Sequence, residues 1–529
     1  MAPAKEVAQV AAAIGRTFSR TVLCRVHGGD EQTIADALSK LIDADLIVLP
    51  GGIGEESSCR FRHALVQEAA YQSMLRTSRV KWHGRIAKVL EHDFPETTER
   101  EPELLAHHFM LAGGLRQAEM YWLAAARMAM TRSANLEAIE HLSRALECLH
   151  QAPVSEDRDR REMDLQIMIA VPLAFVNGYA HQKVRAAYTR ARELCRQYGE
   201  TELLFKVVYG QFRSSLVGGE YAAALESAEF LASIMDEFDD PVLSAAIHRS
   251  RGAVLTYLGR PGEALQHLNM GIGIELKMAD RNRGLNFDVV DLPVALHAYS
   301  AWNNWLCGNS GGAKQAITKA LDYAGETEHP FTVSFSLAFA SWIYQFLGDE
   351  EAVRKTSARL MALSEENAFH FWLGWGRVMN GWARRAELGE KALAMMEQGM
   401  EEWRGTASRL GLSYFLYLYA DAALSLAQVA KARDVLAEAQ AFEVESGEAF
   451  WKPELIRLAG EIARAQGDHV ACEALLHQAV TTAREMGMRG LQLRAAKSAA
   501  HAAKEGRGFV WADAALREAL EGMPKDERK

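Results

Sequence analysis

The pattern of apolar and small residues in residues 252–268 predicts one complete helix–turn–helix. Gly252 lies in the first helix, Leu258-Gly259 closes that helix, and Ala264 and Leu268 lie in the second helix. Small residues at such positions let two helices approach closely, and a glycine in the turn ends a helix without Cβ strain. The stretch therefore predicts two packed helices joined by a tight turn.

The same unit recurs along the chain. Residues equivalent to Ala264 follow one another at spacings of 40, apart from one spacing of 49 and one of 39: Ala224, Ala264, Ala313, Ala352, Ala392, Ala432, Cys472 and Ala512. The turns are marked by Gly218-Gly219, Leu258-Gly259, Cys307-Gly308, Leu347-Gly348 and Gln466-Gly467. A fixed period of this size is typical of a solenoid.

We therefore expect residues 201–522 to form an α-solenoid of helix pairs about 40 residues long. Residues 153–200 predict an irregular unit, in which Val184 begins the period. The longer spacing contains the polar stretch 279–293, which predicts an exposed loop. The last helix, 510–521, is expected to cap the array with a polar face, and 523–529 form a charged tail.

Residues 1–95 follow a different pattern. Apolar periodicity predicts helices at 4–15 and 30–45, and the second has an apolar face made of Ile34, Leu38, Leu41 and Ile42. Short β signals at 46–49 and 59–62 flank a glycine-rich turn at 50–54, and two more helices follow within 63–94. Helices followed by a two-stranded wing are typical of a winged-helix domain.

Residues 96–152 predict connecting helices that form a first repeat-like unit, in which 115–131 pairs with 135–149. Pro95 and Pro102 frame a linker before them, and the charged stretch 155–162 predicts a second linker.

Winged-helix domains can bind DNA, and the distribution of charged residues tests whether this one is suited to it. The helix at 30–45 carries five acidic residues and one lysine, and residues 1–95 carry 12 basic and 11 acidic side chains. The whole chain of 529 residues has a net charge of −10. Phosphate binding needs clustered cations, so we expect this wing to make intramolecular or protein contacts instead.

Composition places the protein in the cytoplasm. The six cysteines form no Cys-x-x-Cys pair and indicate buried thiols in a reducing compartment. Neither a secretory signal nor an apolar run of 18 residues is present, so we expect no membrane association.

The inventory of catalytic motifs is thin. The sequence contains no GxxxxGK[ST] phosphate loop, no HExxH zinc motif and no Gly-x-Ser-x-Gly elbow. His107 and His108 are adjacent, and neighbours on a helix point about 100° apart, which disfavours a shared metal. We expect no enzyme activity, no cofactor and no metal site.

Aromatic residues concentrate in one region. Eight of the 11 tryptophans lie between Trp302 and Trp451. Two interpretations stay open: the rings fill gaps between stacked helix pairs, or they form a binding site on the concave face. In the second case the candidate partner-binding residues are Phe369, Phe371, Trp372, Trp375 and Trp382.

Several stretches together resemble a known family. They are AKEVAQVAAAIGRTFS (4–19), FRHALVQEAAYQSMLR (61–76), HGRIAKVLE (83–91), PELLAHHFMLAG (102–113), HPFTVSFSLAFASWIYQFLGD (329–349), FWLGWGRVMNGWA (371–383), WKPELIRLAGEIA (451–463) and LQLRAAKSAA (491–500). In this order they resemble the C-terminal part of bacterial STAND-type signalling ATPases, which are often fused to class III adenylate/guanylate cyclases.

The resemblance implies an all-α fold, in which a winged helix with a small β-wing precedes a right-handed tetratricopeptide-like superhelix. It also implies a non-catalytic regulatory and interaction module, which binds a protein partner or effector on its concave face. A nucleotide-switch ATPase or cyclase would act in trans, since those domains have no counterpart in this chain. The alternatives are a DNA-binding transcriptional regulator with a repeat sensor, and a fragment with cyclase or ATPase activity.

Overall fold

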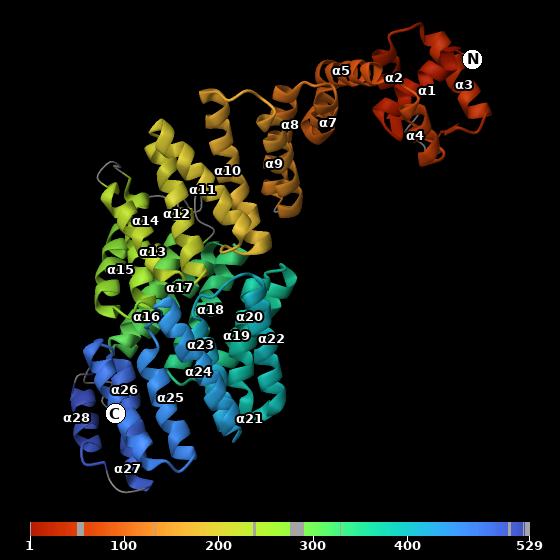
Figure 1. Ribbon diagram of the computed structural model, residues 1–529. Coiled ribbons are helices and arrows are strands. Elements are labelled where there is room, and N and C mark those ends of the chain that lie inside the picture. Colours follow the sequence, from red (N-terminus) through yellow and green to blue (C-terminus); the bar gives the residue numbers. More distant parts are fainter. Residues whose placement is uncertain are drawn as a thin grey trace. The chain divides into compact units, whose positions relative to one another are not determined.

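Figure 1 shows the computed structural model, which describes residues 2–49, 58–132, 134–235, 240–275, 290–327, 329–505, 509–521 and 523. The turn expected at 50–54, most of the loop expected at 279–293 and the tail after Met523 lie outside these residues. The chain is all-α apart from one small sheet in the described residues. It divides into a first unit, Met1–Val176, and a second unit, Asn177–Lys529, and each is described by itself.

The first unit begins with a small helix-and-sheet segment. Its elements are α1 (Ala2–Ile14), β1 (Thr17–Ser19), α2 (Arg20–His27), α3 (Glu31–Asp43), β2 (Ile47–Val48) and β3 (Ser58–Phe61). The three strands pair antiparallel in the order β1-β3-β2. The sequence patterns predicted α1, α3, β2 and β3 but neither β1 nor α2.

The missed strand is defined by pairing rather than by local pattern. Only Phe18 of β1 is buried, and it pairs with Cys59 of β3, which lies 41 residues further along. Ser19 then caps α2 by accepting a hydrogen bond from the amide of Val22. A three-residue strand carries too little alternation to be recognised without its partner.

The rest of the first unit is helical. It contains α4 (Ala64–Gln72), α5 (Arg76–Asp93), α6 (Pro95–Arg100), α7 (Pro102–Leu111), α8 (Leu115–Thr131), α9 (Asn135–His150) and α10 (Glu156–Asn177), which ends one residue beyond the division.

Both linkers expected here are helical instead. Pro95 and Pro102 each begin a helix, at the position where the missing N–H needs no acceptor. The charged stretch 155–162 forms the start of α10. Glu156 and Asp157 suit the positive end of the helix dipole, and each pairs with an arginine four residues on.

The second unit is a series of helix pairs. Its helices are α11 (Gln182–Tyr198), α12 (Thr201–Val217), α13 (Tyr221–Ser233), α14 (Pro241–Tyr257), α15 (Pro261–Glu275), α16 (Leu292–Leu306), α17 (Ser310–Thr327), α18 (Pro330–Phe346), α19 (Glu350–Glu366), α20 (His370–Ala383), α21 (Arg385–Leu388), α22 (Glu390–Gly405), α23 (Leu412–Ser425), α24 (Val429–Ser446), α25 (Lys452–Ala465), α26 (His469–Glu485), α27 (Arg489–Glu505) and α28 (Ala512–Glu521). The predicted helix pairs are confirmed.

The turn glycines adopt the conformation that the pattern predicted. The second residue of each marked turn is left-handed: Gly219, Gly259, Gly308, Gly348 and Gly467. Ala427 takes the same conformation between α23 and α24, with a φ of 59°. Glycine is favoured there because a Cβ is strained at positive φ.

The small residues of the repeat lie where two helices touch. A Cβ built on Gly252 in α14 would lie 2.5 Å from Cγ of Leu268 in α15. Ala264, Ala313, Ala392, Ala432 and Cys472 are buried in the second helices. Ala352 is the exception, because it is half-buried and Val353 takes the buried place one residue later.

The two helices of a pair differ in burial. In α16 every residue except Asn304 is buried, whereas α17 buries only Ala313, Ile317, Ala320 and Ala324. That spacing is one face of an amphipathic helix. The first helices of the pairs therefore form the interior of the second unit, and the second helices cover it.

Candidate functional site

Three contacts close the helix array on itself, and we call them the closing contacts. The carbonyl of Val217, at the end of α12, accepts a hydrogen bond of 2.9 Å from the amide of Arg409. The carbonyl of Tyr257 accepts one of 2.8 Å from the amide of Ala449. Gly490 in α27 lies against Trp305 in α16, so that a Cβ there would be 2.5 Å from the Trp305 carbonyl oxygen. Early turns therefore touch late turns, which buries the first helices on all sides.

Aromatic side chains fill the space behind the closing contacts. The ring of Trp342 lies 4.1 Å from that of Trp375 and 4.8 Å from that of Tyr414, measured between centroids. Trp302 lies 4.7 Å from Phe450, so that early and late pairs share one aromatic core. Edge-to-face and offset contacts of this kind add about 0.5–1.5 kcal/mol per pair beyond area burial.

A cavity of about 50 Å³ opens on this core, and we call it the aromatic cavity. It is lined by Tyr179, Arg213, Leu216, Val217, Arg249, Val290, Tyr299, Phe331, Phe335, Phe339, Phe371, Trp372, Trp375 and Leu410. Four lining residues are half-buried and form its rim: Tyr179, Arg213, Val217 and Phe371. The other residues are buried and form its floor.

Two guanidinium groups border the aromatic cavity. Arg213 lies over the ring of Tyr179, with its Cζ 4.3 Å from the ring centroid. Arg249 is only 5 % exposed and donates from Nη1 to the hydroxyl of Tyr209 at 3.0 Å. Aromatic faces attract cations, so the rings hold both groups at the cavity wall. A mainly aromatic floor that includes the buried Arg249, with the guanidinium of Arg213 at the rim, suits an apolar group next to an anionic one.

The structure separates the candidate aromatics. Phe371, Trp372 and Trp375 line the aromatic cavity. Phe369 contacts the lining ring of Phe331, with centroids 5.3 Å apart. Trp382 lies outside the lining, where its Nε1 donates to Asp421 at 2.9 Å.

Sequence reasoning missed the cations of the cavity. Arg213 and Arg249 both precede Trp302, where the aromatic-rich region begins, and no local motif connects them with it. Only the folding of α12 and α14 against α18 and α20 brings them to the same wall.

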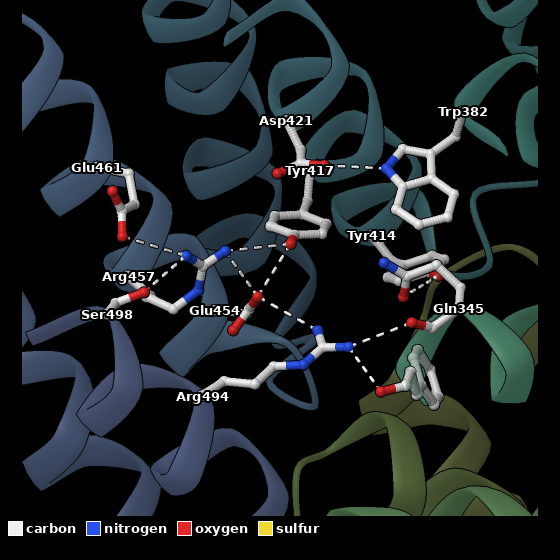
Figure 2. A network of polar contacts seen from close by, with 11 residues as sticks. Gln345, Trp382, Tyr414, Tyr417, Asp421, Glu454, Arg457, Glu461, Arg494 and Ser498 are labelled. Carbon is white, nitrogen blue, oxygen red and sulfur yellow. Dashed lines mark hydrogen bonds and ion pairs between the residues drawn. The ribbon is translucent and has the colours of Figure 1, made fainter. Parts of the chain in front are cut away.

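A buried network of charges lies on another side of the core (Figure 2). Glu454 in α25 is 1 % exposed and pairs with Arg457 at 2.9 Å and with Arg494 of α27 at 3.3 Å. The Tyr417 hydroxyl donates to the same carboxylate. Burial alone would raise the pKa of Glu454, but the two guanidinium groups hold that pKa below its usual range.

Arg494 also connects this network with an earlier pair. Its Nη2 donates to the carbonyl of Phe346, at the end of α18, at 2.7 Å. The network therefore joins α18, α23, α25 and α27, and its charges are matched within it. The role of the network is therefore structural: it holds these four helices together.

A second buried carboxylate is held by neutral hydrogen-bond donors. Glu448 accepts hydrogen bonds from the hydroxyls of Tyr221 and Ser413 and from the amides of Gly411 and Ser413. Burial raises the pKa of Glu448 to about 7, although these four hydrogen bonds lower it. The carboxyl joins the start of α13 to the starts of α23 and α25.

The first unit contains a buried histidine pair. Nδ1 of His83 lies 2.9 Å from Nδ1 of His108, and the hydroxyl of Tyr71 lies 2.9 Å from Nε2 of His83. Burial and neighbouring histidines lower the pKa of His83 to about 4 and that of His108 to about 3. The described residues contain no group of three or more His, Cys, Asp or Glu side chains arranged to hold a metal. Among the described helices, none combines the length and the apolar character needed to cross a bilayer.

The structure thus defines an all-α helical-repeat protein with an aromatic core. No family model matches the chain. A curated relative, an uncharacterized protein of Rhizobium meliloti (strain 1021), is 23% identical over 503 residues. The match covers 94% of this chain and 48% of the relative, so the chain spans about half the relative's length.

Several solved structures share part of the course of this chain at low sequence identity. A Rap protein complexed with competence and sporulation factor is 12% identical, with 66% of this chain and 99% of that chain covered and a TM-score of 0.44. The Cut9–Hcn1 hetero-tetramer of the APC/C is 12% identical, with coverage of 94% and 96% and a TM-score of 0.43. A STAND protein with a tetratricopeptide repeat sensor from Pyrococcus horikoshii is 12% identical, with coverage of 76% and 63% and a TM-score of 0.35.

Proposed function

We propose that the second unit is a non-catalytic sensor module that binds a protein partner at the aromatic cavity. The partner inserts an apolar side chain between Phe371 and Val217 and places a carboxylate beside Arg213. The observation that carries the proposal is the composition of the cavity, which combines a buried aromatic floor with a guanidinium group at a half-buried rim. Anchoring of one side chain in such a pocket is how interface hot spots work.

The size of the cavity favours a side chain over a whole small molecule. Ligand pockets usually enclose about 300–1,000 Å³, and an engineered cavity of about 150 Å³ takes one benzene. The aromatic cavity encloses about 50 Å³, which admits only the end of an aliphatic side chain. Most of the partner would therefore stay on the surface.

We further infer that residues 1–95 form a winged-helix domain. The helices α1, α2 and α3 with the three-stranded sheet in the order β1-β3-β2 support that assignment. The acidic face of α3 argues against groove reading, because its first turn carries Glu31 and its cap is Asp30. The domain would relay occupancy of the second unit to a nucleotide-switch ATPase or cyclase acting in trans.

The test is selection of peptides that bind the full chain from a random library, followed by calorimetry. We expect enriched peptides to carry an aliphatic residue next to Asp, Glu or the C-terminal carboxylate. Arg213→Gln should weaken binding about 10-fold, and Val217→Phe should abolish it by filling the cavity. These substitutions are preferred to Trp372→Ala and Trp375→Ala, because both tryptophans belong to the core.

Arg385→Gln is the matched control, since Arg385 also stacks on an aromatic ring, that of Trp382, but lies outside the cavity. It should bind like the parent protein. Peptides whose affinity is the same for the parent and both cavity variants would show that the partner binds elsewhere.

A further inference from the structure

A second pocket, the polar pocket, lies between α11, α12 and α13. It encloses about 200 Å³ and is lined by Arg185, Tyr188, Thr189, Arg192, Gln211, Ser214, Ser215, Ala223, Glu226 and Ser227. It shares no residue with the aromatic cavity, so the proposed function does not account for it.

The lining residues come from one face of each helix. In α11 they follow the spacing 185, 188, 189 and 192; in α12 they are 211, 214 and 215; in α13 they are 223, 226 and 227. Residues three and four apart are neighbours on a helix surface, so each helix turns a polar stripe into the pocket. Helix interfaces elsewhere in the second unit use apolar residues at such places, as α17 does with Ile317 and Ala320.

Two donors of the pocket are buried without a partner. The Ser214 residue is 3 % exposed, and its hydroxyl has no hydrogen-bond partner among the described residues. In the same part of the chain, Nε of Arg192 is buried and unpaired, while Nη1 donates to Oε1 of Gln211 at 3.0 Å. An unsatisfied buried donor costs about 1–3 kcal/mol, so both groups favour an acceptor in the pocket.

The charged residues of the polar pocket indicate which kind of hydrogen-bond acceptor would bind there. Arg185 and Arg192 face one lining carboxylate, that of Glu226. Arg185 is engaged already, because it pairs with Glu220 at 2.5 Å and donates to the Ala180 carbonyl at 3.0 Å. Arg192 makes no ion pair within 4 Å in the described residues; its guanidinium lies over the ring of Phe230, with Cζ 5.5 Å from the centroid, and bonds to Gln211, so its charge favours an anion.

The helices that form the walls of the pocket pack closely. The ring of Tyr188 lies directly on Gly210 of α12, where a Cβ would overlap the ring. Gly218 likewise leaves room for the guanidinium of Arg185, since a Cβ there would be 2.5 Å from Nη2. Close approach of α11 and α12 therefore depends on two glycines and fixes the position of the polar stripes.

We propose that the polar pocket binds a small soluble molecule through one oxyanion group, a carboxylate or a phosphate. Arg192 and Ser214 donate to that group, and Thr189 and Ser215, which also line the pocket, contribute hydroxyls to hold the rest of the molecule. The volume is below that of sites for drug-sized ligands, which indicates a molecule of metabolite size.

Calorimetric titration of the full chain tests the proposal, with sodium phosphate and sodium succinate as separate probes in a chloride buffer. Binding of at least one probe at a stoichiometry of one is expected, and the pair of titrations tells phosphate from carboxylate. Arg192→Gln and Ser214→Ala should each weaken that binding at least 10-fold. Ala223→Leu should also weaken it, because the larger side chain fills the pocket while all polar groups remain.

Arg190→Gln is the matched control, since Arg190 lies on the same helix, pairs with Glu193 and does not line the pocket. It should bind the probe like the parent protein. If neither probe binds, or if Arg190→Gln lowers affinity as much as Arg192→Gln, the proposal is overturned. Should Arg192→Gln fail to fold, Ala223→Leu decides the matter, and unchanged affinity in that variant rejects the site.

Discussion

The hydroxyl of Tyr221 donates a hydrogen bond to the carboxylate of Glu448, 227 residues further along the chain. Both side chains are buried, and the bond lies beside the closing contacts of Val217 with Arg409 and of Tyr257 with Ala449. A solenoid in which each repeat touched only its neighbours would leave these groups in water. Here the early and late repeats share one interior. A single substitution at Tyr221 or Glu448 therefore affects the early and the late repeats together.

Glu448→Gln is expected to remove a pH dependence of stability. The pKa of Glu448 is raised by burial from 4.5 to about 7, so the folded chain holds this proton more tightly than the unfolded chain. The resulting stabilisation is complete below pH 4.5 and is lost as the pH rises to about 7. From the shift, about 3 kcal/mol would be lost across that window. Urea unfolding at pH 5, 6, 7 and 8 measures it.

The control for this measurement is Glu445→Gln, which removes a surface carboxylate paired with Arg409. Its unfolding free energy should follow the parent profile. Parallel profiles for the parent and Glu448→Gln would contradict the assignment.

Glu454→Gln should destabilise the protein by about 3–5 kcal/mol at neutral pH. The substitution leaves Arg457 and Arg494 without the carboxylate that both face, and neither cation can reach bulk water easily. Asp434→Asn breaks an exposed pair with Arg433 and should change stability by less than about 0.5 kcal/mol. Chemical denaturation of the two variants side by side makes the comparison, and equal losses would disprove the role of the network.

Gly252→Ala should destabilise the second unit by about 1–3 kcal/mol, because the new methyl group would overlap Leu268. Gly262→Ala is a matched change in the next helix, where no atom lies within 4 Å of the new Cβ. It should stabilise by about 0.5–1 kcal/mol through helix propensity. Thermal unfolding should move in opposite directions for the two variants, and a shared direction would refute the close approach.

The histidine pair of the first unit is expected to make that unit sensitive to acid. The pKa of His83 is lowered to about 4 and that of His108 to about 3, mainly by burial. Because the unfolded imidazoles take up protons near pH 6.5, stability is complete above that pH and declines as the pH falls towards 4. Imidazole chemical shifts, assigned with His83→Gln and His108→Gln, should stay those of neutral rings at pH 5.5. Titration of either ring near 6.5 would show that it is not buried.

The local pattern of apolar residues, small residues and glycines was sufficient to predict the helix pairs. Glycines such as Gly259 and Gly308 mark turns because the left-handed conformation excludes most other residues. The same reasoning assigned Ala352 to the small-residue position of its repeat, whereas the next residue, Val353, is the one that is buried there. It also missed β1, whose partner lies 41 residues away, and it interpreted the proline-initiated helix α6 as a linker.

The polar pocket could have been found from the sequence. Its residues recur at helical spacing on three successive helices, and polar stripes facing one another within a repeat array are a recognisable signal. The aromatic cavity could not have been found in this way, since no common repeat position or motif connects Arg213 with Trp372.

The sequence by itself determined the repeat and its turns, because both depend on contacts within about 40 residues. Only the tertiary structure decided that the array closes on itself. That decision rests on contacts such as Val217 with Arg409 and Tyr221 with Glu448, which join segments about 190 to 230 residues apart. Small rotations between successive pairs add up over the array, and no local pattern records their sum. Closure is what turns an aromatic-rich stretch into a core on which the aromatic cavity opens.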